Sequence, residues 1–445
     1  MKLEDHPTVK RYREAHATPE TVAGEPVSAA WIREVCLAAG ADDAGCADLQ
    51  DPVFAPERTR LLSLLTGART LVSLVLRLNP ESVRCLSRSA SDLEFSVGMH
   101  RMDGIAQTVV RRLREKGIHG VNFSTGFPMD LENWPEGMWA ASHKLAAEAA
   151  GLGRRGHNRL LLHPRFGAFV MLDTILVDAA ADQYGRLLDY DPCISCKLCV
   201  AACPVGAIAA DGHFGFTTCL THNYRDRLCG FVDWVENVVA SRTAAEYRAR
   251  ISDPETVALW QGLTYGVSNK CSYCMAVCPA GSENIGPYAE NRQEYSDRVL
   301  QPLRAREERV YVVPGSDAEA HVKARFPHKQ PRRVSSGLRA GTVRGFFRAL
   351  PLAFNRGQTE GLKARWHFVF GGAESYEATV VIDGPSLTVS EGLVGTPDVF
   401  VRADSRTWLK FLAKEQNIVL AIVTGKIKIK GPTKLMDRFA KCFPL

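Results

Sequence analysis

The chain has 445 residues, of which 46% are hydrophobic and 23% charged, and its formal net charge is +6. This length predicts two or three domains with separate cores, and the composition excludes a disordered chain. The longest apolar stretch begins at Leu160 and is interrupted by His163, Arg165, Asp173 and Asp178, so no transmembrane segment is expected.

The first predicted domain covers residues 1–189. Apolar residues recur at helical spacing in 31–40, 105–116 and 138–150, and a glycine ends or follows each stretch. Residues 69–78 and 168–177 are apolar runs of strand length. This alternation of helices and strands predicts an α/β or α+β fold.

Eight cysteines between Cys193 and Cys278 dominate the second predicted domain, residues 190–310. The first run, Cys193-x2-Cys196-x2-Cys199-x3-Cys203-Pro, is the bacterial ferredoxin pattern, in which three thiolates hold one [4Fe–4S] cluster and the fourth holds another. The second run, Cys271-x2-Cys274-x3-Cys278-Pro, has only three thiolates and needs a fourth ligand from elsewhere. We choose Cys219 as that ligand and keep Cys229 as the alternative.

The spacing therefore predicts a ferredoxin-like module with two [4Fe–4S] clusters. We assign Cys193, Cys196, Cys199 and Cys278 to the first cluster, and Cys203, Cys219, Cys271 and Cys274 to the second. Structural zinc is the weaker interpretation, because its ligands usually come as two separated pairs. The first 30 residues carry charges throughout and lack the apolar core of a signal peptide, so we expect a reducing cytoplasm and no disulfides.

Within the module, residues 243–262 and 290–310 are expected to be helical. A basic region follows, because no acidic residue occurs from Ala320 to Thr359. The simplest interpretation of residues 311–340 is a solvated basic linker, and the alternative is a docking strip for an acidic electron donor or an anionic lipid surface. Nucleic-acid binding is not expected, since no interleaved aromatic residues accompany the charge.

The last predicted domain covers residues 341–445. Residues 366–370 and 376–382 alternate between apolar and polar side chains, as half-buried strands do, and shorter strands are expected at 386–389, 398–402 and 426–430. Helices are expected at 406–414, 418–424 and 435–443. The pattern predicts a small α/β domain, and thus a multidomain α+β or α/β chain.

Residues 28–288 resemble the iron–sulfur, cobalamin-dependent reductases typified by epoxyqueuosine reductase and the reductive dehalogenases. The resemblance rests on SHKLAAEAAGLGRRGHNRLLLHPRFGAFVMLDTILVDA, residues 142–179, followed by the eight-cysteine pattern with its lone Cys219. It implies a cobalamin pocket formed by the AGLG segment and the residues after it, and an electron donor such as reduced ferredoxin or flavodoxin. The cofactor-binding residues implied are Gly151, Gly153, Gly156, His157 and Asn158.

The family's proton donor is not matched at its own position. Epoxyqueuosine reductases place an acid about thirteen residues before AGLG, which here is Gly137, and the dehalogenases use a tyrosine, which is absent from residues 122–144. The candidates left are Glu136, Asp130, His143 and Lys144, from which we name Glu136 and His143 as catalytic. For each of them a solvated surface side chain is the simpler interpretation.

Residues 341–445 resemble a sterol carrier protein type lipid-binding domain. The segments FVFGGAESYEATVVIDG, PDVFVRADSRTWLKFLAKEQN and GKIKIKG carry this resemblance. It implies an apolar tunnel for an acyl chain, an acyl-CoA or a sterol. The alternative is a core that the aromatic side chains fill completely.

These features together predict a cytoplasmic iron–sulfur redox enzyme, a cobalamin-dependent reductase acting on a hydrophobic or lipid-like substrate. One alternative is a corrinoid-free, ferredoxin-type electron carrier that serves a lipid-modifying partner. Another is a lipid-transfer protein without catalytic activity, in which the clusters are only structural.

Overall fold

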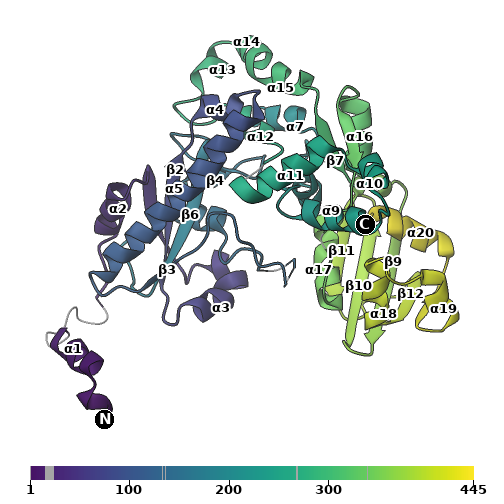
Figure 1. The fold of residues 1–445 in the computed structure, drawn as a ribbon, viewed down its shortest axis with the longest axis horizontal. Coiled ribbons are helices and arrows are strands. Elements are labelled where there is room, and N and C mark those ends of the chain that lie inside the picture. Colours follow the sequence, from purple (N-terminus) through teal and green to yellow (C-terminus); the bar gives the residue numbers. More distant parts are fainter. Residues whose placement is uncertain are drawn as a thin grey trace.

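The computed structural model describes residues 2–15, 25–132, 134–135, 137–266, 269–337 and 339–444. Two β-sheets form the ends of the molecule, and the cysteine-containing segment lies between them (Figure 1). At the N-terminus, η1 (Leu3–Asp5) and α1 (Pro7–Ala15) stand apart from the N-terminal sheet.

The N-terminal sheet has four antiparallel strands in the order β1–β2–β6–β3. They are β1 (Asp43–Asp48), β2 (Thr70–Arg77), β3 (Gly120–Asn122) and β6 (Val170–Val177). Helices α2 (Ala29–Ala38) and α5 (Arg88–Arg114) cover one face, and α3 (Ala55–Leu64) and α6 (His143–Ala149) cover the other. Because β2 and β6 are covered on both faces, their sequences are nearly continuous apolar runs.

Strands β2 and β6 and helix α2 lie close to the ranges expected from the sequence. Strand β1 was not expected. Its sequence, DAGCAD, consists of residues of low β-propensity, so the pairing with β2 rather than local preference makes it a strand. Gly45 lies close to α6, where an added Cβ would be 2.8 Å from the carbonyl oxygen of Ala150. The helix expected at 105–116 extends back to Arg88, and the one expected at 138–150 begins only at His143.

Short elements connect this sheet to the cysteine segment. They are η2 (Pro52–Phe54), α4 (Pro80–Arg84), and the two-stranded ribbon of β4 (Arg154–Arg155) and β5 (Leu161–Leu162).

The cysteine segment consists of short helices joined by loops. In chain order they are α7 (Leu198–Ala202), α8 (Phe216–Asn223), α9 (Cys229–Val239), α10 (Ala244–Arg250), α11 (Asp253–Tyr265), α12 (Tyr273–Ala276), α13 (Gly286–Glu290), α14 (Arg292–Tyr295), the π-helical turn η3 (Ser296–Leu300) and α15 (Gln301–Ala305). The helix expected at 243–262 is divided because Ser252 caps α11 through the backbone N–H of Glu255. The helix expected at 290–310 ends at Ala305.

Residues 311–340 differ from the basic linker expected there. Strands β7 (Arg309–Val312) and β8 (Gln330–Arg333) pair in parallel and are joined by α16 (Asp317–Arg325). Val310 and Val312 pack in one core with Cys199 and Cys203. Lys329 is buried and paired with Glu308 at 2.8 Å. Lys323 and Arg333 pair with Glu319 inside this unit, and Arg332 pairs with Glu255 of α11. Counting charges along the sequence does not reveal these pairs.

The C-terminal sheet has the order β11–β10–β9–β12–β13, with β9 and β12 parallel and the other pairs antiparallel. Its strands are β9 (Lys363–Gly371), β10 (Tyr376–Asp383), β11 (Ser386–Glu391), β12 (Val399–Asp404) and β13 (Ile427–Lys430). The helices are α17 (Val343–Ala353), η4 (Arg356–Gln358), α18 (Ser405–Leu412), α19 (Ile418–Val423) and α20 (Thr433–Cys442).

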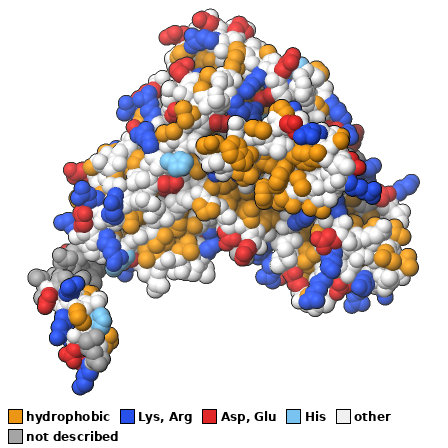
Figure 2. All heavy atoms as spheres, in the orientation of Figure 1, with side chains coloured by type: hydrophobic (Ala, Val, Ile, Leu, Met, Phe, Trp, Pro, Cys, Tyr) orange, Lys and Arg blue, Asp and Glu red, His pale blue; other side chains and the backbone are white. Residues whose placement is uncertain are grey.

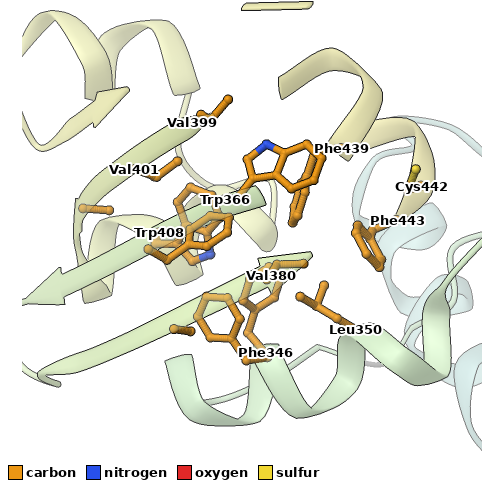
Figure 3. Close-up of a cluster of buried hydrophobic side chains, with 14 of the residues drawn as sticks. Phe346, Leu350, Trp366, Val380, Val399, Val401, Trp408, Phe439, Cys442 and Phe443 are labelled. Carbon is orange, nitrogen blue, oxygen red and sulfur yellow. The ribbon is translucent and has the colours of Figure 1, made fainter. Parts of the chain in front are cut away.

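The inward face of the C-terminal sheet follows the expected alternation. Trp366, Phe368 and Phe370 of β9 are 0%, 0% and 2% exposed and pack against the helices. Figure 3 shows Trp366, Trp408, Phe439 and Phe346 gathered between the sheet and α17, α18 and α20.

Apolar side chains also gather on the surface over α9 and α11 (Figure 2). The exposed ones include Phe231, Val235 and Val239 on α9, and Trp260 and Leu263 on α11. Within the part of the chain that is described, no helix is both long enough and apolar enough to cross a membrane.

Candidate functional site

The structure brings the eight cysteines into two neighbouring groups. Cys193, Cys196, Cys199 and Cys278 line one small cavity together with Pro279. Two residues of the first loop, Ser195 and Lys197, have positive φ angles of 54° and 61°, which turn the chain so that successive cysteines face the same space. Cys278 thus joins the first run although 75 positions separate it from Cys203.

The second group contains Cys203, Cys219, Cys271 and Cys274. Burial raises the pKa of the Cys219 thiol, and Cys203 and Cys271 lie close enough for their charges to raise it further. Asn223 at the end of α8 holds the second run in place, because its side-chain oxygen accepts the backbone N–H of Cys271 at 3.1 Å. The N-terminal domain also contributes, since Asn158 donates to the carbonyl oxygen of Cys274 at 3.1 Å.

Burial disfavours the thiolate form in both groups. It raises the pKa of Cys199 and of Cys278 to about 12, and it raises the pKa of Cys203, Cys219, Cys271 and Cys274. A positive metal centre compensates this cost, since thiolates are the ligands of iron–sulfur clusters. No three His, Cys, Asp or Glu side chains among the described residues are arranged to hold a single metal ion.

A cavity of about 620 Å³, which we call the cluster cavity, lies beside the second group. Cys271 and Cys274 form part of its wall, and His143, Lys144 and Tyr224 also line it. The remaining wall is mostly apolar. It includes Phe95, Met99, Phe127, Met138, Trp139, Leu160, Val170, Met171, Phe216 and Leu352. The N-terminal domain, the cysteine segment and α17 therefore all contribute to this cavity.

His143 is held as a neutral side chain. Its Nε2 donates to the carbonyl oxygen of Ser124 at 3.1 Å, and its Nδ1 lies 3.0 Å from the hydroxyl of Thr174. Burial lowers the pKa of His143 to about 4. Because both ring nitrogens already have partners, His143 is better suited to positioning the cavity wall than to releasing a proton.

Two other side chains bring polar groups into the cluster cavity. Loss of contact with bulk water lowers the pKa of Lys144, whose ammonium group lies near Cys219 and Cys274. Burial raises the pKa of Tyr224 to about 12, so its hydroxyl keeps its proton at neutral pH. Tyr224 was not among the residues expected from the sequence, although it ends the FTTCLTHNY segment and directly follows α8, five residues after Cys219.

The glycines expected to contact a corrinoid lie elsewhere. A Cβ at Gly151 would be 2.8 Å from the carbonyl oxygen of Arg186, and one at Gly153 or Gly156 would meet Leu162 at 2.6 or 2.5 Å. These glycines therefore allow the chain to pack against itself, and they do not line the cluster cavity.

His157 and Asn158, also expected at the corrinoid, lie against the first cysteine group. Lys197 donates to the Nδ1 of His157 at 3.0 Å.

Asp130, another proton-donor candidate, does not line the cluster cavity. Asp130 is exposed, and its carboxylate accepts the backbone N–H of Glu132 at 3.1 Å. Glu136 lies outside the described residues, as does the side chain of Cys229, although the backbone of Cys229 begins α9. Of the four donor candidates, His143 and Lys144 line the cavity.

The cluster cavity has features that suit a corrinoid, which is flat, largely apolar and edged with amide groups. Its walls are mainly apolar, and two lining side chains carry a buried oxygen without a hydrogen-bond partner, Oε1 of Glu57 and Oδ1 of Asn269. Such atoms need a partner when they are buried. Amide N–H groups at the edge of a macrocycle would supply it, so the residues fit the group.

A second cavity of about 590 Å³, which we call the C-terminal cavity, lies inside the C-terminal domain and against the cysteine segment. Trp408, Phe411, Ile422, Met436 and Phe439 line it from the C-terminal helices. The aromatic residues of this domain therefore leave space between the sheet and helices instead of filling it.

Comparisons with known proteins agree with parts of this picture. Residues 187–209 match the 4Fe-4S binding domain family, and residues 355–444 match the SCP-2 sterol transfer family. The epoxyqueuosine reductase of Cyclobacterium marinum is 28% identical over 165 residues, which are 36% of this chain and 49% of that protein. The chain thus spans about half the length of this relative.

Two solved structures are similar to part of the chain. An epoxyqueuosine reductase bound to a tRNA-Tyr stem loop has a TM-score of 0.32 at 21% identity, covering 43% of this chain and 56% of that one. A catabolic reductive dehalogenase has a TM-score of 0.37 at 16% identity, covering 66% of this chain and 35% of that one.

Proposed function

We propose that the chain is an iron–sulfur reductase that holds two [4Fe–4S] clusters, a corrinoid in the cluster cavity and an apolar lipid in the C-terminal cavity. The observation that carries this proposal is the wall of the cluster cavity, where Cys271 and Cys274 meet His143, Lys144 and Tyr224. A cluster on these cysteines lies directly beside a mainly apolar cavity into which Tyr224 brings a protonated hydroxyl. The similarity to iron–sulfur epoxyqueuosine reductases supports the same class of reaction.

The cysteines are proposed to act as two sets of ligands. Cys193, Cys196, Cys199 and Cys278 hold the first cluster, and Cys203, Cys219, Cys271 and Cys274 hold the second. When bound, the clusters supply one-electron transfer, and a corrinoid supplies a strongly reducing metal centre.

The protein's own residues exclude water and provide a proton. Phe127 and Trp139 form an apolar wall around the reacting space, and the ring of Phe127 packs against that of Tyr224 with 5.9 Å between their centroids. The hydroxyl of Tyr224 keeps its proton at neutral pH, and its place on the cavity wall makes it the donor to a reduced substrate. His143 positions the wall through Ser124 and Thr174.

Anaerobic titration with cobalamin tests this assignment. The wild-type protein should bind cobalamin and contain about eight irons with an equal amount of sulfide. Gly126→Leu should lose cobalamin binding with its iron intact, because Gly126 lines the cluster cavity and an added Cβ meets only the flexible end of Met99 at 3.7 Å.

Gly104→Leu is the matched control, since no atom lies within 4 Å of a Cβ at that exposed position. Wild-type protein that contains both clusters and takes up no cobalamin would contradict the corrinoid assignment and favour the electron carrier. A single tightly bound zinc without sulfide would contradict the iron–sulfur assignment.

A further inference from the structure

The C-terminal cavity is built by two parts of the chain. Its C-terminal wall comes from α17, α18, α19, β13 and α20. The opposite wall comes from the cysteine segment, where Thr217, Thr218 and Thr221 of α8 and residues 311–313 at β7 line the same space. The C-terminal domain therefore does not close its cavity alone, and the helix that carries Cys219 forms part of the boundary.

The two walls differ in polarity. The α8 side presents the three threonines, and Ser316, Ser336 and Asn355 add further polar groups to the lining of the cavity. The elements after Trp408 contribute mainly apolar side chains, including Phe411, Leu412, Ile418, Ile422, Ile429 and Met436. An elongated ligand with one polar end therefore fits best with that end toward α8.

Two polar atoms on this cavity have no partner. The hydroxyl of Thr221 and the indole nitrogen of Trp408 are buried without a hydrogen bond, and their residues are only 2% and 3% exposed. Buried polar groups are nearly always hydrogen-bonded in native proteins. A ligand whose oxygen-bearing end lies at α8 would provide the missing partner of the Thr221 hydroxyl.

Only a thin partition separates the C-terminal cavity from the cluster cavity. At three places consecutive residues line opposite cavities, and these pairs are Trp134 and Pro135, Phe216 and Thr217, and Leu352 and Ala353. The rings of Trp134 and Phe216 stack across it with 6.2 Å between their centroids. Thr217 donates to the carbonyl oxygen of Leu352 at 2.9 Å, which joins α8 to α17.

We propose that the C-terminal cavity presents an elongated lipid to the cluster cavity, with its oxygen-bearing end at Thr221 and its apolar tail among α18, α19 and α20. The partition of Trp134, Phe216 and Leu352 is the passage between the two sites. Building on the reductase function proposed above, such a lipid is the substrate class of the enzyme. The ring of Phe216 forms part of the partition and stacks on that of Trp134, so rotation of the Phe216 side chain is the movement that opens it.

Photo-crosslinking of the full-length holoprotein tests the orientation. Two stearic acids are used, one with a diazirine near the carboxyl group and one with the diazirine near the methyl end, and labelled peptides are mapped by mass spectrometry. The carboxyl-side probe should label residues 216–224 or Trp134, and the methyl-side probe should label residues 418–423 or 433–442. The reverse pattern, or labelling outside the cavity, would overturn the proposal.

A pair of matched variants tests the polar anchor. Thr221→Val should weaken oleate binding about tenfold, measured by quenching of tryptophan fluorescence, because it removes one ligand hydrogen bond. Thr388→Val makes the same substitution at an exposed position of β11 that does not line the cavity, and its affinity should stay within about twofold of wild type. Equal or tighter binding by Thr221→Val would overturn the assignment of the polar end.

Competition distinguishes the lipid classes. If oleate alone prevents labelling by the stearic acid probes, the ligand is an acyl chain, and if cholesterol alone prevents it, the ligand is a sterol. If neither prevents labelling, the proposal is overturned. The reductase function is measured separately, by iron content and cobalamin uptake. If cobalamin is not taken up but the crosslinking pattern is as expected, the reductase function and the substrate role are contradicted and the lipid site stands. If cobalamin is taken up but no lipid binds, only the lipid site is contradicted.

Discussion

The cluster cavity and the C-terminal cavity are nearly equal in volume, at about 620 and 590 Å³, but their linings differ. The cluster cavity combines apolar walls with two cysteines, a histidine, a lysine and a tyrosine. The C-terminal cavity has a mainly apolar wall and a short polar side on α8. The comparison shows one space equipped for chemistry and a neighbouring one equipped for holding an apolar molecule, with α8 and α17 contributing to both.

The largest expected effect concerns the second cysteine group, which lies beside the cluster cavity. Cys219→Ala should lose about half of the protein's iron, because the second cluster would keep only three thiolates. Cys442→Ala, at a buried cysteine in the C-terminal core, should keep all of it. Anaerobic iron and sulfide assays measure both variants. A full iron content in Cys219→Ala would mean that another residue, such as Cys229, is the fourth ligand.

The next prediction separates packed core from cavity wall within the C-terminal domain. Phe368→Ala should destabilise the domain by about 3–5 kcal/mol, because Phe368 is fully buried and its ring packs against Phe347, Trp408 and Phe439. Phe411→Ala should cost less, since Phe411 is only half-buried and already borders an open space. Hydrogen exchange of peptides from β10 measures the difference. Equal costs would mean that the cavity is filled by packing in solution.

A pH dependence is expected on the cluster-cavity side. Burial lowers the pKa of His143 from 6.5 to about 4, so between these values the unfolded chain binds a proton that the folded protein does not. The free energy of unfolding should therefore be highest above pH 6.5 and fall as the pH drops toward 4, by about 3 kcal/mol for this group.

His143→Gln provides the comparison for that pH dependence. Its hydrogen exchange in β6 should change less than wild type between pH 6.5 and 4, since glutamine does not titrate. An identical pH dependence in both proteins would show that His143 is not buried in its neutral form.

The smallest effect is expected at the start of α17, which both cavities share. Thr342 caps this helix by accepting the backbone N–H of Gly345 at 2.9 Å, and Glu374 accepts two further N–H groups. Thr342→Ala should cost about 1 kcal/mol, and Thr342→Ser, which keeps the hydroxyl, should cost less. Thermal unfolding followed by near-ultraviolet circular dichroism compares the two. A loss well above this value would show that Glu374 does not support the helix start.

Strong local patterns allowed much of the fold to be predicted. The alternating residues 366–370 and 376–382 became β9 and β10, and the apolar runs at 69–78 and 168–177 became β2 and β6. Elements that form only through pairing with distant segments were not predicted. Strand β1 has no apolar alternation, and the unit formed by β7, α16 and β8 was hidden by its basic residues.

The sequence by itself determined the chemistry that the chain carries. Cysteine spacing keeps the members of each run together whatever the surrounding fold, because ligands a few residues apart stay near one another. The fold then joined Cys278 to the first run and Cys203 to the second. Tertiary structure alone decided which side chains meet. It placed Cys271 and Cys274 on a cavity wall with Tyr224, and it packed Gly151, Gly153 and Gly156 against other residues of the chain. It also set α8 and α17 side by side, because contacts between distant segments depend on packing, which local spacing does not encode.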